Sequence, residues 1–395
     1  MPLQPFSPQA RAFLEQHKAD EPAALMLQAK RFPGLPVADL VQQIQARQKA
    51  KTKLPGWAEN YDLIFPANLS VEQASSEQTA AYKAKLVTGG LLADLTGGFG
   101  VDAFYFAQQF RQVIHVEQNE ALSEIVRFNF KQLSASNVTF FAGNATVFLA
   151  DLPQPLDCFY LDPARRGTAN QKVHLLEDCE PDILRLLPEL LQKSKTVLLK
   201  TSPLLDINLA VSQLKTVQKI WVIAVDNECK EVLYQIGHEL NPDPEITAVN
   251  LSPKATQTEF TFRKSGEETT EITYSEPQQF IYEPNAAIMK AGAFRQIAAR
   301  FNAAKLHRNS HLYTSAELIP DFPGRTFKLK TVAKYQKKVL LPLIPEKKAN
   351  ITVRNFPETV AQIRQKTGLK EGGNLYLFAT TDLHHNPVIL ICEKV

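Results

Sequence analysis

The sequence predicts an α/β fold built on a mostly parallel, doubly wound sheet, and two observations carry this prediction. Between residues 91 and 225, short apolar runs alternate with stretches in which apolar residues recur at helical spacing. Such alternation is typical of a parallel sheet with helices on both faces. The first of these runs is followed directly by a glycine-rich turn, as is common where a strand meets a helix in this fold class.

The region ahead of this alternation has a different texture. Residues 1–70 show helical periodicity that is interrupted by prolines. A further helix is expected at about 76–87, with Ser75 or Ser76 as its N-cap. The pattern therefore predicts an N-terminal helical region before the α/β core.

After residue 225 the pattern predicts strands and then a small α+β accessory region. The strand-like runs, which we expect to pair in antiparallel fashion, lie at 231–237, 246–252, 258–264 and 270–276. A single helix is expected over 286–301. The last part is expected to form a compact unit with a helix near 358–366 and strands near 374–380 and 387–394.

Composition restricts the class of protein. The chain has 395 residues, which is long enough for two or three domains, and its 44% hydrophobic fraction is ordinary for a globular protein. No run approaches the roughly 18 apolar residues that span a bilayer, and the N-terminus carries no secretory signal. The four cysteines lie far apart, without metal-ligand spacing. We therefore expect a cytoplasmic protein with no membrane partner, no metal and no disulfide framework.

Charge is distributed unevenly along the chain. Between Asp321 and Glu371 there are 12 Lys and Arg residues against 4 Asp and Glu residues, a local net charge of +8. The whole chain carries +3, so the remainder carries −5. A basic C-terminal part is typical of a surface that meets a polyanion, although a solvated basic face without a ligand gives the same pattern.

The glycine-rich turn has the features of a nucleotide-cofactor site. Asp94 ends an apolar run, and the turn that follows contains Thr96, Gly98 and Gly100. Glycines at such a turn let the backbone approach a ligand closely and leave N–H groups at the start of the helix. Glu117 ends the next strand, about 20 residues on, where a carboxylate can accept hydrogen bonds from ribose hydroxyls.

The same turn also matches a second cofactor pattern. Gly98-x-Gly100-x-x-Ala103 is a dinucleotide fingerprint, so a nicotinamide or flavin oxidoreductase is the runner-up on these residues. Two features favour S-adenosylmethionine (SAM) instead. Asp94 precedes the glycines, where it can engage the amino-acid part of SAM, and the fourth strand ends in a proline motif that begins at Asp162.

These motifs resemble those of class I SAM-dependent methyltransferases, particularly the enzymes that modify nucleic acids. More narrowly, the chain is similar to a bacterial group in which a Rossmann-like methyltransferase domain precedes a ferredoxin-like unit and a THUMP-like domain. The resemblance rests on segments from Val71 onward, namely VEQASSEQTAAYKAKL, DLTGGFGVDA, LDPARRG, NECKEVLY, YEPNAAIMKAGAF and RNFPETVAQIRQKTGLKEGGNLYLF. We accordingly expect a helical region at 1–70, a methyltransferase domain at 71–264, a ferredoxin-like linker unit at 265–320 and a basic THUMP-like domain at 321–395.

The resemblance also assigns residues to SAM. The implied contacts come from the segment before the first strand, the glycine turn and the ends of the next two strands: Gln73, Ser75, Asp94, Thr96, Gly98, Gly100, Glu117 and Asn144. Asn144 occupies the position that usually carries an adenine-contacting Asp. Its carbonyl can still pair with the adenine amino group, and the alternative is a turn residue without a ligand.

The run that ends at Asp162 carries the expected catalytic motif. It lies at the carboxyl edge of the sheet, where open α/β sheets bind ligands, and it matches the fourth methyltransferase motif. We expect Asp162, Pro163 and Arg165 to be catalytic, with Asp162 as hydrogen-bond or proton acceptor for a base nitrogen. Where the motif usually has an aromatic residue this chain has Arg165, so stacking on the base falls to a guanidinium plane or to another part of the chain.

A related motif is found in RNA uridine C5 methyltransferases, which also need a cysteine nucleophile near the end of the fifth strand. This chain has Lys200-Thr201-Ser202-Pro203 there, so we discount C5 chemistry.

RNA, either tRNA or rRNA, is the expected partner. The residues expected to contact it are basic and lie after the proline motif and in the C-terminal part: Arg166, Lys334, Lys337, Lys338 and Arg354. For Arg165 and Arg166 the alternative is a structural ion pair with Glu177 or Asp178. The competing functions are a methyltransferase for proteins or small molecules and a SAM-binding protein without catalysis.

Overall fold

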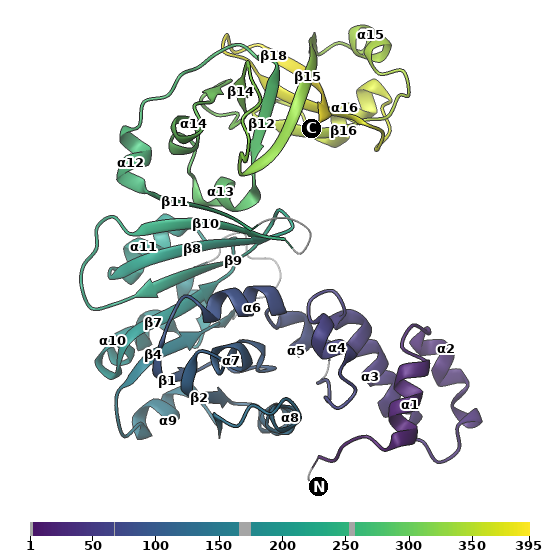
Figure 1. Ribbon diagram of the computed structural model, residues 1–395, viewed down its shortest axis with the longest axis vertical. Helices are drawn as coiled ribbons and strands as arrows, with labels where there is room; N and C mark the ends of the chain where they lie inside the picture. Colours follow the sequence, from purple (N-terminus) through teal and green to yellow (C-terminus); the bar gives the residue numbers. More distant parts are fainter. Residues whose placement is uncertain (1–2, 67, 166–174, 253–256) are drawn as a thin grey trace. The chain divides into compact units, whose positions relative to one another are not determined.

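A nine-stranded sheet organises the α/β part of the chain (Figure 1). In spatial order its strands are β11 (Thr258–Arg263), β10 (Glu245–Leu251), β8 (Val217–Val225), β9 (Glu228–Ile236), β7 (Ser194–Thr201), β4 (Leu156–Leu161), β1 (Gly89–Asp94), β2 (Phe110–Glu117) and β3 (Val138–Ala142). The pairs β7–β4, β4–β1, β1–β2, β2–β3 and β8–β10 are parallel, whereas β7–β9 and β10–β11 are antiparallel. The predicted, mostly parallel α/β fold is confirmed.

The computed structural model describes residues 3–66, 68–165, 175–252 and 257–395. The chain divides into two compact units, the first formed by Met1–Gln218 with Val232–Asn241 and the second by Lys219–Glu231 with Pro242–Val395. Among the described residues, no helix is long and apolar enough to cross a membrane.

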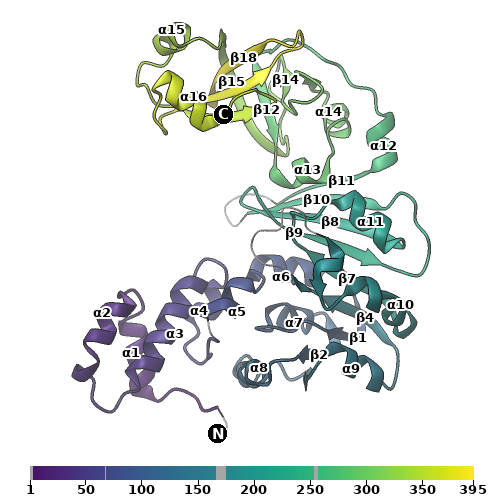
Figure 2. The same cartoon turned by 180° about the vertical axis from the view of Figure 1, so that it is seen from behind.

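Helices cover both faces of the parallel part of the sheet. They are α6 (Glu77–Ala84), α7 (Val101–Phe106), α8 (Glu120–Gln132), α9 (Ala145–Asp151), α10 (Ile183–Lys193) and α11 (Ile207–Leu214). Figures 1 and 2 show α7 and α8 on one face and α9 and α10 on the other. This is the arrangement that right-handed crossovers impose when the chain winds from β1 towards β3 and then back towards β7.

The predicted N-cap of α6 is confirmed, because the Ser76 hydroxyl accepts a hydrogen bond from the Thr79 N–H at 3.1 Å.

The N-terminal region is helical, as expected. It contains α1 (Pro8–Gln16), α2 (Pro22–Leu27), a 3₁₀ turn (Ala29–Arg31), α3 (Val37–Ala50), α4 (Pro55–Glu59) and α5 (Asn68–Gln73). The buried Arg47 guanidinium donates to the carbonyls of Ala58, Asn60 and Leu63 at 2.9, 3.0 and 2.6 Å. Hydrogen bonds from a charged donor are stronger than those from a neutral one. Arg47 of α3 therefore fixes the backbone at 58–63, in the segment that leads to the α/β core.

The second sheet has seven strands and belongs to the C-terminal part of the chain. In spatial order they are β13 (Ala304–Lys305), β14 (Tyr313–Ser315), β12 (Phe280–Pro284), β15 (Gly324–Lys334), β18 (Pro387–Lys394), β17 (Leu375–Thr381) and β16 (Asn350–Arg354). Its neighbouring helices are α12 (Lys264–Thr269), α13 (Ala286–Ala291), α14 (Gln296–Arg300), α15 (Lys337–Leu340) and α16 (Val360–Thr367), with a 3₁₀ turn at Leu341–Leu343.

Two local predictions were wrong, and a third was correct for only one of two strand neighbours. The helix expected over 286–301 is broken into α13 and α14, because Gly292 caps α13 in a left-handed conformation with φ +85°. The run at 270–276 makes only an isolated bridge between Tyr274 and Lys305 rather than a strand. The run at 246–252 pairs with β11 in antiparallel fashion, as expected, but its other neighbour β8 is parallel to it, since the chain reverses at 226–227 and again after β9.

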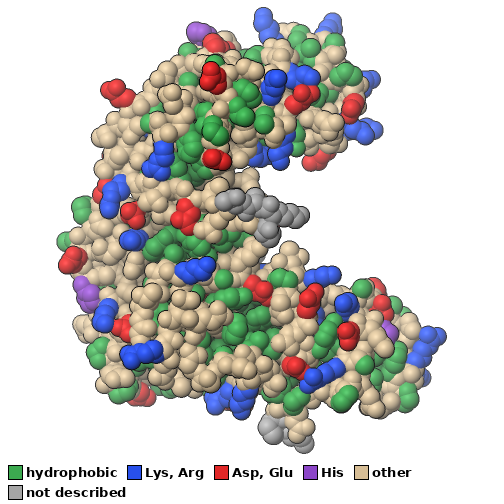
Figure 3. Space-filling view, in the orientation of Figure 1, with side chains coloured by type: hydrophobic (Ala, Val, Ile, Leu, Met, Phe, Trp, Pro, Cys, Tyr) green, Lys and Arg blue, Asp and Glu red, His purple; other side chains and the backbone are tan. Residues whose placement is uncertain are grey.

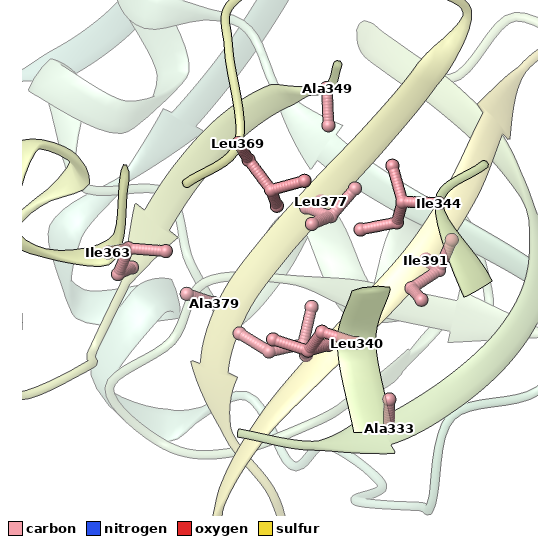
Figure 4. Packing of buried hydrophobic residues seen from close by; sticks show 10 residues of the cluster. Ala333, Leu340, Ile344, Ala349, Ile363, Leu369, Leu377, Ala379 and Ile391 are labelled. Atoms are coloured by element: carbon pink, nitrogen blue, oxygen red, sulfur yellow. The ribbon is translucent and has the colours of Figure 1, made fainter. Parts of the chain in front are cut away.

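The C-terminal sheet is stabilised by a compact apolar cluster. Figure 4 shows Leu377 of β17 and Ile391 of β18 among Leu340, Ile344 and Leu369. Leu377 and Ile391 are each 1% exposed, and burial of this kind is the main stabilising contribution to a small domain.

We predict that Leu377→Ala lowers the free energy of unfolding by about 2–5 kcal/mol, because it removes buried methyl groups and leaves a cavity. Leu343→Ala is the matched control: this side chain is 40% exposed, and its loss should change stability by less than about 0.5 kcal/mol. Urea denaturation of both variants checks the prediction, and equal effects would contradict it.

Candidate cofactor and substrate site

The turn between β1 and α7 contains three glycines in two kinds of environment. A Cβ at Gly97 would lie 2.3 Å from His115 Nε2, and one at Gly100 would lie 2.6 Å from Val126 Cγ1, so both positions exclude a side chain because of the core below. At Gly98 the Thr96 carbonyl oxygen, at 3.7 Å, is the one heavy atom of the described residues, chain neighbours aside, within 4 Å of a Cβ. The turn is thus packed tightly on its inner side and open at Gly98.

Glu117 at the end of β2 is tied to the same turn. Its Oε2 accepts the Gly98 N–H at 2.9 Å, and its Oε1 accepts the Asn119 N–H at 2.7 Å. The side chain is only partly buried. The structure therefore brings two predicted cofactor residues, Gly98 and Glu117, into direct contact at the surface of the site.

Asp94 ends β1 beneath the turn and is almost fully buried, with 1% exposure. Its Oδ1 accepts the Thr96 N–H at 3.0 Å. Burial raises the pKa of Asp94 well above its ordinary value, and the neighbouring carboxylates of Asp102 and Asp162 raise it further, while the Thr96 N–H offsets only part of this.

A buried charged network lies next to Asp94. Lys83 Nζ is 2.9 Å from Asp102 Oδ1, and Lys83 is 0% exposed. Ser75 Oγ and Tyr160 Oη donate to Asp102 Oδ2 at 2.7 and 2.8 Å, and Lys83 also donates to Ser75 at 2.7 Å. The network joins α6, α7, β4 and the segment before α6 beneath the glycine turn.

The pKa of Asp102 moves in the opposite direction to that of Asp94. Burial alone would raise it, but the charges of Lys83 and Lys200, together with the hydrogen bonds from Ser75 and Lys83, outweigh burial and hold the pKa below its ordinary value. Asp102 was not predicted as a site residue, although it stands in the DLTGGFGVDA segment. No local sequence pattern identifies Asp102 as a site residue, because its partner Lys83 lies 19 positions earlier in the chain.

His115 on β2 was also missed. It is 0% exposed, and burial lowers its pKa to about 4 although the nearby Gly97 and Gly98 backbone groups oppose this shift. The neutral imidazole fills the space beneath Gly97, so its contribution is to the packing of the turn.

Asp162 follows β4 at the carboxyl edge of the sheet, as expected. Its N–H donates to Thr96 Oγ1 at 2.6 Å, and its Oδ2 accepts a hydrogen bond from Lys200 Nζ of β7. The side chain of Asp162 is 32% exposed and that of Lys200 is 12% exposed. The structure therefore joins the expected catalytic carboxylate to the cofactor turn through Thr96 and adds Lys200, which sequence reasoning had considered only as a position lacking cysteine.

The residues after Asp162 enter a short ladder. Pro163 is partly buried, and β5 (Ala164–Arg165) pairs with β6 (Cys179–Glu180), placing the Arg165 backbone opposite Cys179. A 3₁₀ turn, Leu176–Asp178, precedes β6. The prediction for Arg166 lies outside the described residues.

Two predicted cofactor residues, Ser75 and Asn144, have other contacts, and a third, Gln73, faces solvent. Ser75 donates to Asp102, as described above. Gln73 ends α5 and is exposed. Asn144 is the N-cap of α9, and its Oδ1 accepts both the N–H and the hydroxyl of Thr146, at 2.8 and 2.6 Å. These roles in the fold are compatible with contact to a ligand only through the remaining polar groups, such as the Asn144 amide N–H₂.

The predicted RNA-contacting residues of the C-terminal part differ in environment. Lys334, Lys337 and Lys338 are exposed. Arg354 is half-buried and lies 2.8 Å from the buried Glu283 carboxylate, which Arg325 also contacts. Figure 3 shows Lys and Arg side chains on the surface of this part of the chain, with acidic side chains among them. Arg354 thus has a structural partner, whereas the three lysines face solvent.

The sheet order, the glycine turn after β1 and the acidic residues at the strand ends define a Rossmann-like core of the methyltransferase type. The chain is 32% identical to the "putative methyltransferase from Porphyromonas gingivalis W83", whose crystal structure it matches with a TM-score of 0.88 over 99% of this chain and 100% of that chain. The chain belongs to the same family.

Two models of known domains match the C-terminal part. Residues 280–323 match a ferredoxin-like domain and residues 324–394 match a THUMP domain-like family. The predicted resemblance to methyltransferases with these two C-terminal domains is therefore confirmed. A comparison with the curated proteins gives no match.

Other solved structures match only part of the chain. TrmK of M. capricolum, in complex with S-adenosylhomocysteine, is 14% identical over 45% of this chain and 71% of that chain, with a TM-score of 0.32. An rRNA methylase from Streptococcus thermophilus is 10% identical over 42% of this chain and 96% of that chain, with a TM-score of 0.31. At these TM-scores neither match carries an argument about this chain.

The pKa of Asp94 is raised and that of Asp102 is lowered, so we predict that replacing each with Asn has opposite effects on the stability of the fold. The folded pKa of Asp94 is raised, so the native chain loses stability as pH rises from about 3.9, the ordinary Asp value, towards the raised value. Asn does not titrate. Asp94→Asn should therefore be more stable than the native chain at pH 7, with a margin that shrinks as pH falls towards 4.

Asp102→Asn is the matched contrast. The folded pKa of Asp102 is lowered, so its carboxylate contributes stability above about pH 3.9 that is lost as pH falls through the folded value. Removing it also leaves the Lys83 ammonium buried without its counter-charge, at a cost of about 3–5 kcal/mol at pH 7. Urea denaturation between pH 4 and 8 measures both variants, and a loss of stability in Asp94→Asn at pH 7 would contradict this account.

Proposed function

We propose that this chain is a SAM-dependent methyltransferase that modifies a base nitrogen in tRNA or rRNA. The observation that carries the proposal is the direct link between the cofactor turn and the expected catalytic carboxylate, through the hydrogen bond from Asp162 N–H to Thr96 Oγ1. A methyl donor at the turn and an acceptor beside Asp162 would then meet at one edge of the sheet.

The residues of the turn fit SAM. Gly98 offers open space where a side chain would stand, as a backbone cradle for a ligand requires. The partly exposed Glu117 carboxylate can accept hydrogen bonds from ribose hydroxyls, and the buried Asp94 lies at the strand end expected to face the amino-acid part. Bound there, SAM supplies an activated methyl group, and the chain has mainly to position the acceptor.

Two observations support RNA as the substrate. Residues 324–394 match a THUMP domain-like family, and the segment from Asp321 to Glu371 carries a net charge of +8. Exposed lysines on this part, including Lys334, Lys337 and Lys338, suit contacts to phosphates. Asp162 would accept a hydrogen bond or a proton from the base nitrogen, and Pro163 and Arg165 of the same motif are the other proposed catalytic residues.

We predict that Gly98→Arg abolishes SAM binding, because the side chain would occupy the open space above the turn. Gly292→Arg is the matched control. Gly292 also has a positive φ, and none of the described residues beyond its chain neighbours has a heavy atom within 4 Å of its Cβ position, but it caps α13 in the second unit. Isothermal titration calorimetry with SAM compares the two. Normal binding by Gly98→Arg would place the cofactor elsewhere.

The experiment that tests the function is transfer of labelled methyl from SAM to total RNA, with total protein in parallel, using RNA from a strain that lacks the gene. We expect label in RNA, and we expect Asp162→Ala to reduce transfer by at least about 10²-fold while SAM affinity is unchanged. Loss of SAM binding in Asp162→Ala would move this residue into the cofactor site.

The alternatives give different results in the same assay. Label in protein alone would indicate a protein methyltransferase, and SAM binding with no transfer would indicate a binding protein without catalysis. Fluorescence titration with a reduced nicotinamide detects the oxidoreductase alternative.

A further inference from the structure

Two lysine–aspartate pairs join the neighbouring strands β4 and β7, one near each end. Lys195 Nζ is 2.7 Å from Asp157 Oδ1, and its side chain is 81% exposed. Lys200 is bonded to Asp162, and its side chain is only 12% exposed. Exposed ion pairs contribute little to stability, because water weakens the attraction between their charges. A charge that is largely withdrawn from water interacts more strongly with neighbouring charges. The two pairs therefore have the same chemistry but different environments.

Asp157 and Asp162 also differ in their backbone contacts. Asp157 Oδ2 accepts the N–H groups of Gly90 and Leu91 at 2.6 and 3.0 Å, so this carboxylate fixes the start of β1. Asp162 is fixed by its backbone N–H, which donates to Thr96, and by Lys200 at Oδ2, while its side chain remains 32% exposed. A carboxylate with one oxygen held and the group still accessible is suited to receive a ligand in a defined orientation.

A carboxylate beside an ammonium is complementary to two kinds of base edge. One is a lactam edge, an N–H beside a carbonyl, as in guanine and uracil. The other is an amino group beside a ring nitrogen, as in adenine and cytosine. The carboxylate and the ammonium can hydrogen-bond to either kind of edge, so only the charge that develops during methyl transfer can distinguish the lactam from the amino group.

Charge favours the lactam. An amino group that attacks a methyl group gains positive charge, which a neighbouring ammonium opposes. A lactam nitrogen loses its proton instead, and negative charge develops on the adjacent oxygen, which the ammonium stabilises. Because Lys200 is largely withdrawn from solvent, its effect on the charge of the base is screened less than that of the exposed Lys195 would be.

We propose that Lys200 and Asp162 act as one unit that selects a lactam nitrogen of RNA, N1 of guanine or N3 of uracil, as the methylated atom. This inference rests on the proposed function. The ring nitrogen forms its bond to the methyl carbon, its proton passes to the Asp162 carboxylate, and the electrons of the broken carbon–sulfur bond remain on sulfur as a thioether. The charges balance, since a sulfonium and a carboxylate become neutral together while Lys200 keeps its proton as a positioning residue.

The test has two parts, and the first is the identity of the product. RNA labelled by the native chain is digested to nucleosides, and the methylated position is assigned by chromatography and mass spectrometry. Label on N1 of guanosine or N3 of uridine supports the inference. Label on adenosine, on cytidine, on the N2 amino group of guanosine or on a carbon overturns it and leaves the proposed function standing. No label in any RNA removes the proposed function and this inference with it.

The second part is a set of lysine variants. We expect Lys200→Met to lower kcat by at least about 10²-fold with unchanged KM for SAM, and Lys200→Arg to recover part of the loss because it keeps the charge. Lys195→Met, on the same strand, should change kcat by less than about twofold. SAM calorimetry on each variant shows that the cofactor turn is folded. Equal kcat values for Lys200→Met and Lys195→Met would overturn the role of Lys200.

Discussion

The buried ion pair between Lys83 and Asp102 is the interaction on which the site depends. It joins α6 to α7, and the hydroxyls of Ser75 and Tyr160 add the preceding segment and β4 to the same carboxylate. The turn that presents Gly98 begins at β1 and ends at α7, so the position of α7 fixes the position of the turn. Without this network, the tight packing of Gly97 on His115 and of Gly100 on Val126 would have no fixed support.

A buried pair of this kind contributes more to geometry than to net stability. The cost of removing two charges from water offsets much of their attraction, whereas loss of one partner leaves the other uncompensated. Here the cluster holds three carboxyl groups, those of Asp94, Asp102 and Asp162, around the two ammonium groups of Lys83 and Lys200. Burial, together with the excess of carboxyl groups over ammonium groups, raises the pKa of Asp94. A cationic ligand bound at this strand end would favour the charged carboxylate and lower that pKa.

The features that sequence predicted correctly depend on local chemistry. Strand and helix alternation was visible because the central positions of β4, β7 and β8, at 158–161, 197–199 and 220–224, are buried on both faces of the sheet and are apolar. The N-cap at Ser76 could be read from one residue and the absence of helix breakers. The break at Gly292 was missed because a glycine within a helical pattern can either be tolerated or end the helix, and the tertiary environment decides between these outcomes.

Sequence alone determined the class of fold, the glycine turn and the acidic residues at the strand ends, because each of these follows from residues close together in the chain. Tertiary structure decided which charges meet. Lys83 with Asp102, Lys200 with Asp162 and Arg354 with Glu283 are separated by 19, 38 and 71 positions, and each pairing gives at least one residue a role that its sequence neighbours do not indicate. The physical reason is that the effect of a charge depends on distance and burial in space, and neither quantity is written in local sequence.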